Sequence, residues 1–389
     1  MTMVALGDIA EVNPRLSERP GSDELVSFLP MASLGTDGTT EAGEERPFAE
    51  VSKGYTPFLD GDLLIAKITP CFQNNKIGQA RIDHRVGVGS TEFHVVRPRL
   101  DVADARYLLH FLRRDQVRAE GERRMTGSGG QRRVPASFLQ HLQLPLPPLD
   151  EQRRIAHVLD SADRLTNRVE GMTAALDGLG PALFRALFQD LADEWPVRQL
   201  GEFVSDSRLG LVRAASAQAP DLPHAYMKMD AISRSGHLLP EKFTRVAASE
   251  VERATTSVRD GDLLFNTRNT RDLVGKSVVY RGASVLYNNN LMRLRFTPDV
   301  TADYVHGYLW SRAGVRQLEA RKVGTTSVFA IYAKALATVT LPVPPRSLQT
   351  TFSQALAGAA ATREDLCQRR IRFDGLRRSL QVRAFSGQL

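Results

Sequence analysis

Four sequence motifs occur twice in this chain of 389 residues, in the same order. The first copies are LGDIAEV from Leu6, DGDLLIAK from Asp60, DVADARYLLHFL from Asp101 and LPLPPLDEQRRI from Leu144. The second copies are LGEFVSD from Leu200, DGDLLFNT from Asp260, DVTADYVHGYL from Asp299 and LPVPPRSLQTTF from Leu341. The copies are offset by 194 to 200 residues. This period is far longer than that of a solenoid, so it indicates a duplicated half of the chain.

A helical segment with a heptad pattern follows each proline-rich motif. Its apolar residues alternate at spacings of three and four, which is typical of a coiled-coil seam. The second segment keeps the same register when 197 is added to each position. Two unrelated amphipathic helices would explain either segment alone, but not the shared register. The predicted seam consists of Ile155, Val158, Leu165, Val169, Leu176 and Leu179, and of Phe352, Leu366, Phe373, Leu376 and Leu380. Pro181 predicts a kink in the first helix.

Each half thus combines about 150 residues of mixed structure with about 40 residues of helix. Short β-branched runs such as EFHVV (92–96) and SVVY (277–280), separated by Gly, Asn and Pro, favour a small α+β domain. The predicted boundaries are 1–148 and 193–345 for the globular domains, and 149–192 and 346–389 for the helices. A helix of 32 residues is roughly 47 Å long, which is enough to separate two such domains.

The charge of the chain favours a polyanionic partner. The net charge is +7, and the chain contains 43 Arg but only 8 Lys. The guanidinium group offers a planar fork to phosphate oxygens and guanine edges, whereas the ammonium group of lysine acts as a point charge. A genome rich in GC would also favour Arg codons, so composition alone leaves both explanations open.

The chain shows no sign of export or membrane insertion. Cys71 and Cys367 are its only cysteines, and the start MTMVALGDIA lacks a basic region followed by an apolar one. No stretch reaches the roughly 18 apolar residues of a membrane span. We therefore expect a cytoplasmic protein with reduced thiols and no membrane association.

The usual motifs of DNA-modifying enzymes are missing. We find neither the Asn/Asp-Pro-Pro-aromatic tetrapeptide of adenine methyltransferases nor Asp/Glu two residues before any lysine, as a common nuclease motif requires. TGSGGQRR (126–133) does not have the spacing of a dinucleotide site. His-Glu-x-x-His, Cys-x-x-Cys and the P-loop lysine motif are also missing. The sequence predicts a non-enzymatic chain with no catalytic residue, metal site or bound cofactor.

Polar loops in both halves suit DNA contact. ITPCFQNNKIG (68–78), FNTRNTRDLVGK (265–276) and YNNNLMRLRF (287–296) concentrate amide and basic side chains in predicted turns. Amides can pair with adenine, and cations can contact guanine or phosphate. Asn also favours turns for purely structural reasons, so each loop alone is ambiguous. The predicted DNA-binding residues are Lys67, Asn74, Asn75 and Lys76 in the first domain, Arg268, Asn269, Arg271 and Asn289 in the second, and Arg132 and Arg133 for phosphate.

LPLPPLDEQRRIAHVLDSADRL (144–165), preceded by MTGSGGQRRVPASFL (125–139), resembles the end of a target-recognition domain and the first central helix of a type I restriction-modification specificity subunit. GDLLIAKITPCFQNNKIG with VGSTEFHVVRP (88–98) is similar to one recognition-domain sequence of that family, and GDLLFNTRNTRDLVGK to another. The second proline-rich motif departs from the pattern, since Arg346, Ser347 and Leu348 replace Leu149, Asp150 and Glu151 while Gln349 matches Gln152. This departure leaves open whether the second helix contacts partner subunits as the first does.

The resemblance implies two α+β target-recognition domains separated by two long antiparallel coiled-coil helices. It also implies a non-catalytic subunit that binds double-stranded DNA with two methyltransferase subunits and, optionally, two endonuclease subunits that translocate DNA. The cofactor S-adenosylmethionine would then be bound by the methyltransferase. Two pseudo-equivalent domains suit a bipartite target, and their different loops predict half-sites of different sequence.

Two other classes of protein remain as alternatives. A methyltransferase or nuclease with diverged motifs would be active as the purified chain alone. A coiled-coil scaffold with protein-binding ends would show no salt-dependent affinity for DNA, whereas a DNA-reading protein loses affinity steeply with salt.

Overall fold

The protein is described by a computed structural model that covers residues 2–41, 43–128, 130–189, 194–234, 236–324 and 327–389. The chain divides into two compact units, Met1–Gly171 with Cys367–Leu389, and Met172–Leu366. The long helices α6 (Leu149–Phe184) and α11 (Arg346–Ser386) each contribute residues to both units. The predicted end of the first helix at residue 192 lies outside the described residues.

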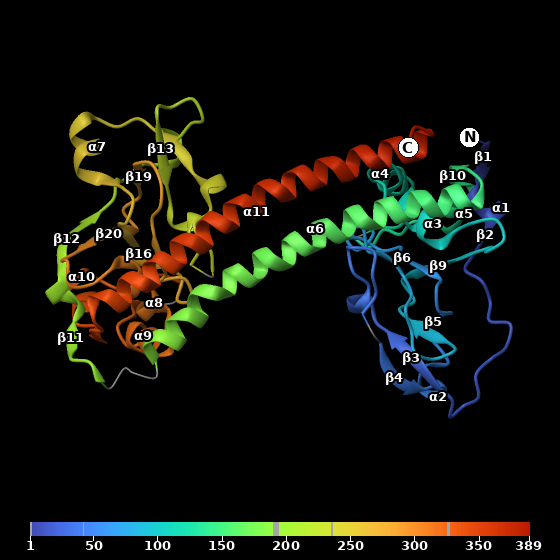
Figure 1. The fold of residues 1–389 in the computed structure, drawn as a ribbon, viewed down its shortest axis with the longest axis horizontal. Helices are drawn as coiled ribbons and strands as arrows, with labels where there is room; N and C mark the ends of the chain where they lie inside the picture. Colours follow the sequence, from blue (N-terminus) through green and yellow to red (C-terminus); the bar gives the residue numbers. More distant parts are fainter. Residues whose placement is uncertain (1, 42, 129, 190–193, 235, 325–326) are drawn as a thin grey trace. The chain divides into compact units, whose positions relative to one another are not determined.

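The described residues of the first unit form three sheets, whose strands are seen in Figure 1. Its strands are β1 (Thr2–Ala5), β2 (Ala10–Val12), β3 (Leu25–Leu29), β4 (Glu44–Pro47), β5 (Thr56–Phe58), β6 (Leu63–Ala66), β7 (Ile77–Gln79), β8 (Gly87–Gly89), β9 (Phe93–Pro98) and β10 (Gln143–Leu146). The antiparallel sheet β2-β9-β6-β7 has the fully buried strand β6 in its middle, as the apolar run LLIA requires. The sheet β4-β3-β8-β5 contains the parallel pair β3 and β8, and β1 pairs with β10.

Short helices complete the first unit. They are α1 (Leu6–Ile9), η1 (Met31–Ser33), α2 (Phe48–Val51), α3 (Ala105–Leu112), α4 (Asp115–Arg124) and α5 (Ala136–His141). Helix α3 begins where the Asp104 carboxylate accepts a hydrogen bond from the Tyr107 amide at 2.9 Å, an N-cap that satisfies a free amide of the first turn. The apolar side chains of α3 are buried in the main core of the unit.

The second unit repeats these three sheets and adds a fourth. Its strands are β11 (Val197–Gln199), β12 (Val204–Leu209), β13 (His224–Met227), β14 (Thr244–Val246), β15 (Ser257–Val258), β16 (Leu263–Asn266), β17 (Arg268–Asn269), β18 (Ser277–Val279), β19 (Val285–Tyr287), β20 (Leu291–Phe296), β21 (Val323–Gly324), β22 (Phe329–Ala330) and β23 (Thr340–Pro342). The sheets β12-β20-β16-β18, β14-β13-β19-β15 and β11-β23 have the strand orders of the first unit, including a parallel pair, β13 and β19. The additional sheet is β17-β22-β21.

The helices of the second unit follow the same order along the chain. They are the π-helical η2 (Arg185–Gln189), η4 (Leu200–Phe203), η5 (Ala215–Ala217), η6 (Met229–Ala231), η7 (Pro240–Lys242), α7 (Glu250–Thr256), α8 (Ala302–Trp310), α9 (Arg312–Glu319) and α10 (Ala333–Ala337). Helix α6 runs through Pro181 without a break and is followed directly by η2. The irregular turn therefore comes after the proline, as a π-helical segment. The predicted α+β class and the duplication are confirmed.

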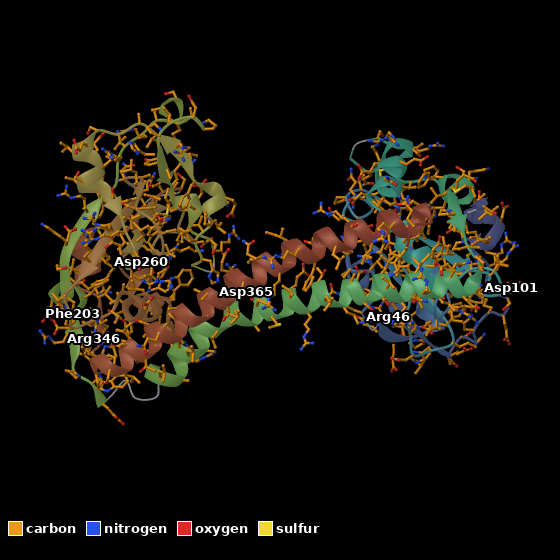
Figure 2. All side chains as sticks on the ribbon, turned by 45° about the horizontal axis from the view of Figure 1, so that its top comes forward. Arg46, Asp101, Phe203, Asp260, Arg346 and Asp365 are labelled. Atoms are coloured by element: carbon orange, nitrogen blue, oxygen red, sulfur yellow. The ribbon has the colours of Figure 1, made fainter. Side chains whose placement is uncertain are left out.

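The two copies of the Asp-Gly-Asp motif, at Asp60 and Asp260, form equivalent turns. In the first unit, the Asp60 side chain accepts a hydrogen bond from the Ile82 amide at 3.1 Å, and Asp62 forms an ion pair with Arg97. In the second unit, Asp260, which lies within the globular part (Figure 2), accepts one from the Gly282 amide at 3.1 Å. Gly61 and Gly261 have φ of +83° and +84°, which favours glycine in this turn. The Asp-Gly-Asp sequence is therefore a folding motif.

The core of each unit is completed by the last turns of a long helix that began in the other unit. In the first unit, Phe385 of α11 lies 5.2 Å from Tyr107, measured between ring centroids. In the second unit, Phe188, directly after α6, lies 4.9 Å from Tyr304. Both the phenylalanines and the tyrosines are 197 residues apart in the sequence, so the two cores are closed in the same way.

The two long helices are antiparallel. In the first unit, Arg377 lies 3.8 Å from Asp163, and Arg370 lies 3.8 Å from Glu170. Seven residues forward along α6 therefore correspond to seven residues back along α11. One heptad further, in the second unit, Arg363 hydrogen-bonds to Asp177 at 2.8 Å. This pairing is the one that the resemblance implied.

The structure corrects part of the predicted seam. Ile155, Val169, Phe352 and Leu366 are buried, and Val158, Leu176, Leu179, Phe373 and Leu380 are half-buried. The prediction is wrong at Leu165 and Leu376, which are 44% and 47% exposed. The next residues in the sequence, Thr166 and Arg377, are the less exposed ones. The face of α11 that contacts α6 carries an arginine in an ion pair every seven residues. A search for apolar residues alone could not recognise these polar contact positions.

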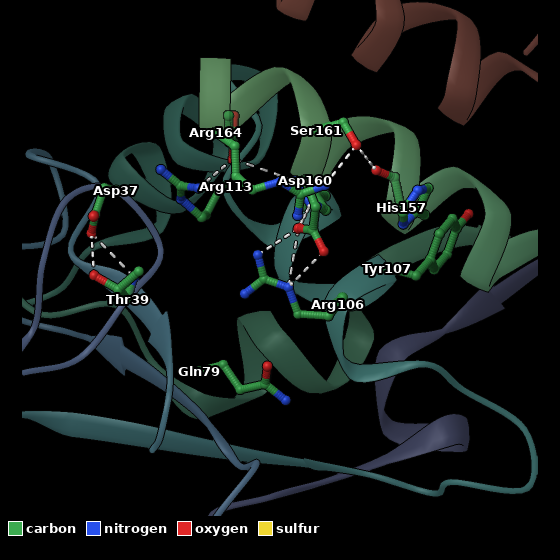
Figure 3. Close-up of polar contacts among 12 residues, drawn as sticks. Asp37, Thr39, Gln79, Arg106, Tyr107, Arg113, His157, Asp160, Ser161 and Arg164 are labelled. Carbon is green, nitrogen blue, oxygen red and sulfur yellow. Dashed lines mark hydrogen bonds and ion pairs between the residues drawn. The ribbon is translucent and has the colours of Figure 1, made fainter. Parts of the chain in front are cut away.

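A polar network joins α3 to α6 in the first unit (Figure 3). His110, only 1% exposed, and Arg106 both hydrogen-bond to Asp160, at 2.7 and 3.1 Å. Arg113 lies 3.3 Å from Asp163. Burial raises the pKa of the Asp160 carboxyl, but the hydrogen bonds from His110 and Arg106 outweigh this effect and hold that pKa well below its usual value.

Within the described residues, no helix combines the length and the apolar composition that a bilayer-spanning segment needs.

Candidate DNA interface

The first predicted recognition loop is a turn between β6 and β7, as expected, but its side chains differ in exposure. Asn74 is exposed. The Asn75 amide nitrogen donates to the Arg113 carbonyl at 3.2 Å, and the Lys76 ammonium donates to the Met31 carbonyl at 3.0 Å. Asn75 has a φ of +58°, a left-handed conformation that Asn tolerates better than most residues. Asn75 and Lys76 therefore have intramolecular roles, and DNA contact by them stays a prediction.

The two arginines predicted to contact phosphate are also engaged within the domain. Arg133 makes an ion pair with Glu92 at 2.8 Å, and hydrogen bonds from this guanidinium hold the pKa of Glu92 below its usual value. Arg132 donates to the Met125 carbonyl at 3.1 Å. Gly129, within the segment TGSGGQRR (126–133), lies outside the described residues. Both arginines stabilise the loop, and Arg133 forms an isolated antiparallel β-bridge with Ile68, two residues after the end of β6.

Lys67 lines a cleft of about 500 Å³ in the first unit. Arg15, Arg19, Phe48 and Tyr55 also line this cleft. None of the lining residues is a carboxylate. No hydrogen bond or ion pair of the Lys67 ammonium occurs within the part of the chain that the structure describes. A cleft lined by three cations and several aromatic residues suits a nucleic acid, because phosphate attracts the charges and aromatic rings can stack on bases.

The predicted residues of the second domain gather around β17. Arg268 and Asn269 form this strand, and Arg271 follows it. Arg271 pairs with Glu319 at 2.7 Å, so its charge is partly neutralised. Arg268 is exposed and makes no side-chain hydrogen bond or ion pair to any described residue. Asn289 lies in the turn between β19 and β20.

A second cleft, of about 340 Å³, lies in the second unit. It is lined by Asn269 and by three residues that were not among the predicted ones, Arg234, Lys242 and Asn266. The two clefts use different segments of the repeated fold, so the two domains present different chemistry. Among the described residues, no group of three or more His, Cys, Asp or Glu side chains could hold a metal ion.

Sequence reasoning missed most of the cleft residues. Arg15 and Arg19 are about 50 residues from Lys67 in the sequence, so only the tertiary fold brings them together. Asn266 could have been found from the repeat, because it aligns with Ala66 when the two copies are compared. An amide in place of an alanine at the end of the same predicted strand is a recognisable signal.

The known proteins of similar sequence are specificity subunits of type I restriction enzymes. Residues 1–174 match the family model "Type I restriction modification DNA specificity domain". The chain is 38% identical over 197 residues to the specificity subunit of the type I restriction enzyme EcoAI of Escherichia coli, which covers 50% of this chain and 33% of that subunit. It is 36% identical over 202 residues to the EcoEI specificity subunit of Escherichia coli, covering 51% and 34%. The chain thus spans about a third of the length of these two relatives.

Solved structures share the fold. The type I restriction-modification S subunit from M. genitalium has a TM-score of 0.59 and 12% identity over 99% of this chain and 96% of that one. A chain from a structure describing complex assembly and conformational transition of the type I R-M system has a TM-score of 0.56 and 20% identity, covering 100% and 98%. These structural matches show that the chain shares its fold with those proteins.

Proposed function

We propose that this chain, whose residues 1–174 match a type I restriction modification DNA specificity domain, is the DNA-reading subunit of a type I restriction-modification complex. Each globular domain reads one half of an asymmetric bipartite site, and the paired helices set the spacer between the halves. The proposal rests on one observation. The chain contains two copies of one fold, each followed by a long helix with the same heptad register, and the two copies have clefts with different lining residues.

The surface of the first unit supports a partner role for the helices. Leu165, Ile371, Leu376 and Val382 on α6 and α11 are between 44% and 62% exposed. Exposed apolar side chains on a long helix are favourable contacts for another protein. We propose that methyltransferase subunits dock there, that they bring the S-adenosylmethionine and the catalytic residues, and that endonuclease subunits join optionally. The chain itself binds DNA without acting on it.

The decisive experiment is single-molecule sequencing of a host free of adenine methylation. The host expresses this chain together with the methyltransferase subunit that we propose as its partner. We expect methylated adenines in one bipartite motif with two different halves and an unspecified spacer. The methyltransferase expressed alone is the control and should leave no motif. A motif that is the same with and without this chain would contradict the proposal.

The alternatives predict other results. A diverged enzyme would methylate or cleave DNA as the purified chain alone. A protein-binding scaffold would have no DNA affinity that falls with salt, whereas the proposed reading subunit loses affinity steeply because it releases counterions from phosphate.

A further inference from the structure

The cleft of the second unit contains a buried amide with an unused hydrogen-bonding atom. Asn266 ends β16 and is only 1% exposed. Its Oδ1 is buried and has no hydrogen-bond partner among the described residues. A buried polar atom without a partner costs stability, so natural folds avoid it unless a ligand or water completes it. Asn266 is also one of the residues that line the cleft.

The first domain shows that the fold does not need this amide. Ala66 occupies the equivalent place at the end of β6 and is fully buried. The Ala66 amide donates to the Lys76 carbonyl at 3.0 Å, and the Asn266 amide donates to the Lys276 carbonyl at 2.7 Å. The same backbone position is therefore filled once by a methyl group and once by a carboxamide. Since local structure is satisfied by alanine, the carboxamide needs another explanation.

The rest of the cleft wall carries net positive charge. Arg234 and Lys242 are exposed and form no ion pair with any described carboxylate. Lys276 donates to the Arg234 carbonyl at 2.7 Å and lies 5.8 Å from the centre of the Trp310 ring. Asp230, the one carboxylate among the described lining residues, lies 3.9 Å from Lys228. Two unpaired cations at a small opening suit the phosphates that flank a nucleotide.

We propose that this cleft reads an adenine of the half-site recognised by the second domain. The Asn266 carboxamide contacts the base, because an amide offers a donor and an acceptor to N7 and N6 of adenine. Arg234 and Lys242 contact the flanking phosphates. The cleft volume of about 340 Å³ admits one base and not a stretch of duplex, so a single position is read here. This inference rests on the proposed function.

The test is Asn266→Ala, the residue that the first domain already has at this position. It is expressed with the methyltransferase in the methylation-free host, and the methylated motif is compared with that of the wild-type chain. We expect one A·T position in one half-site to relax to any base, while the other half-site and the spacer stay the same. Methylation at the original sites should fall by about 5- to 150-fold in single-turnover reactions.

Thermal unfolding separates this role from a structural one. Removing an unpaired buried amide should leave the melting temperature of Asn266→Ala unchanged or higher. Arg234→Ala and Lys242→Ala serve as matched variants, which should reduce methylation at all sites alike without altering the motif. A bipartite wild-type motif that Asn266→Ala leaves unchanged would overturn the assignment while the proposed function stands. Absence of any motif with the wild-type chain would refute the proposed function itself.

Discussion

At the scale of single residues, two glutamines explain why the proline-rich motif is repeated. Gln152 is fully buried, accepts from the Asp104 amide at 2.9 Å and donates to the carbonyls of Val102 and Pro147. Gln349 makes the same three kinds of contact in the second unit, with its acceptor bond to the Thr301 amide at 2.8 Å. The glutamine ties the start of each long helix to its domain. The substitutions at Arg346, Ser347 and Leu348 leave this contact intact.

Replacing Gln349 by Ala should therefore lower the free energy of unfolding by about 2–4 kcal/mol. The change leaves a part-buried amide, a part-buried carbonyl and a buried carbonyl without these partners, and each buried group of this kind costs roughly 1–3 kcal/mol. Urea denaturation measures the effect. The neighbouring exposed Arg346→Ala is the control and should change stability by less than about 0.5 kcal/mol. Equal stability of the two variants would contradict the structural role.

Asp160 gives the first unit a pH-dependent contribution to stability. Its folded-state pKa lies below the usual value, so the carboxylate stabilises the fold above the unfolded pKa of about 3.9 and loses this effect as the pH falls toward the lowered pKa. Asp160→Asn should cost about 2 kcal/mol at pH 7, since the bonds from His110 and Arg106 lose a charged acceptor. In urea titrations at decreasing pH, the difference from wild type should shrink below pH 4. The exposed Asp150→Asn is the control, and a difference independent of pH would contradict this account.

At the scale of elements, ion pairs fix the register of the two long helices. Acidic residues occur every seven positions on α6, at Asp163, Glu170 and Asp177, and arginines face them from α11 at the same interval. A parallel arrangement, or a slip by a few residues, would place these charges out of register. Such polar positions specify one pairing among the alternatives that apolar contacts alone would allow.

A charge exchange at Asp177 and Arg363 tests this register. Asp177→Arg should destabilise the chain by about 0.5–1 kcal/mol, because two guanidiniums then face each other on a half-exposed surface. Arg363→Asp alone should have a similar effect, and the double variant should recover most of the loss. A double-mutant cycle by urea denaturation, repeated at high salt, measures the coupling. Additive losses in the double variant would show that the pair does not set the register.

At the scale of the whole molecule, both long helices run without interruption from one compact unit into the other. In the proposed function, the length of these helices sets the distance between the two DNA half-sites. The heptad spacing of the ion pairs allows this length to change in steps of seven residues without disturbing the remaining pairs.

Deleting Val169–Ala175 and Leu366–Arg372 together should shorten the DNA spacer. Each helix loses seven residues, or about 10 Å, which corresponds to about three base pairs. The deletion removes Glu170 with Arg370 and leaves the pairs of Asp163 and Asp177 in register. Methylation mapping should report both half-sites unchanged with a shorter gap. Deleting the segment from only one helix is the control and should abolish methylation, whereas an unchanged gap in the double deletion would refute the spacer role.

The sequence alone determined the duplication, the α+β class and the two long helices, because each depends on patterns along the chain that recur at a fixed offset. The same patterns could not determine which face of a helix meets its partner, and Leu165 and Leu376 were misplaced for that reason. Only the tertiary structure showed that Arg133 and Lys76 are already paired and that Arg15 lines the same cleft as Lys67. A cleft is made by residues distant in the sequence, and their proximity depends on packing that no local pattern records.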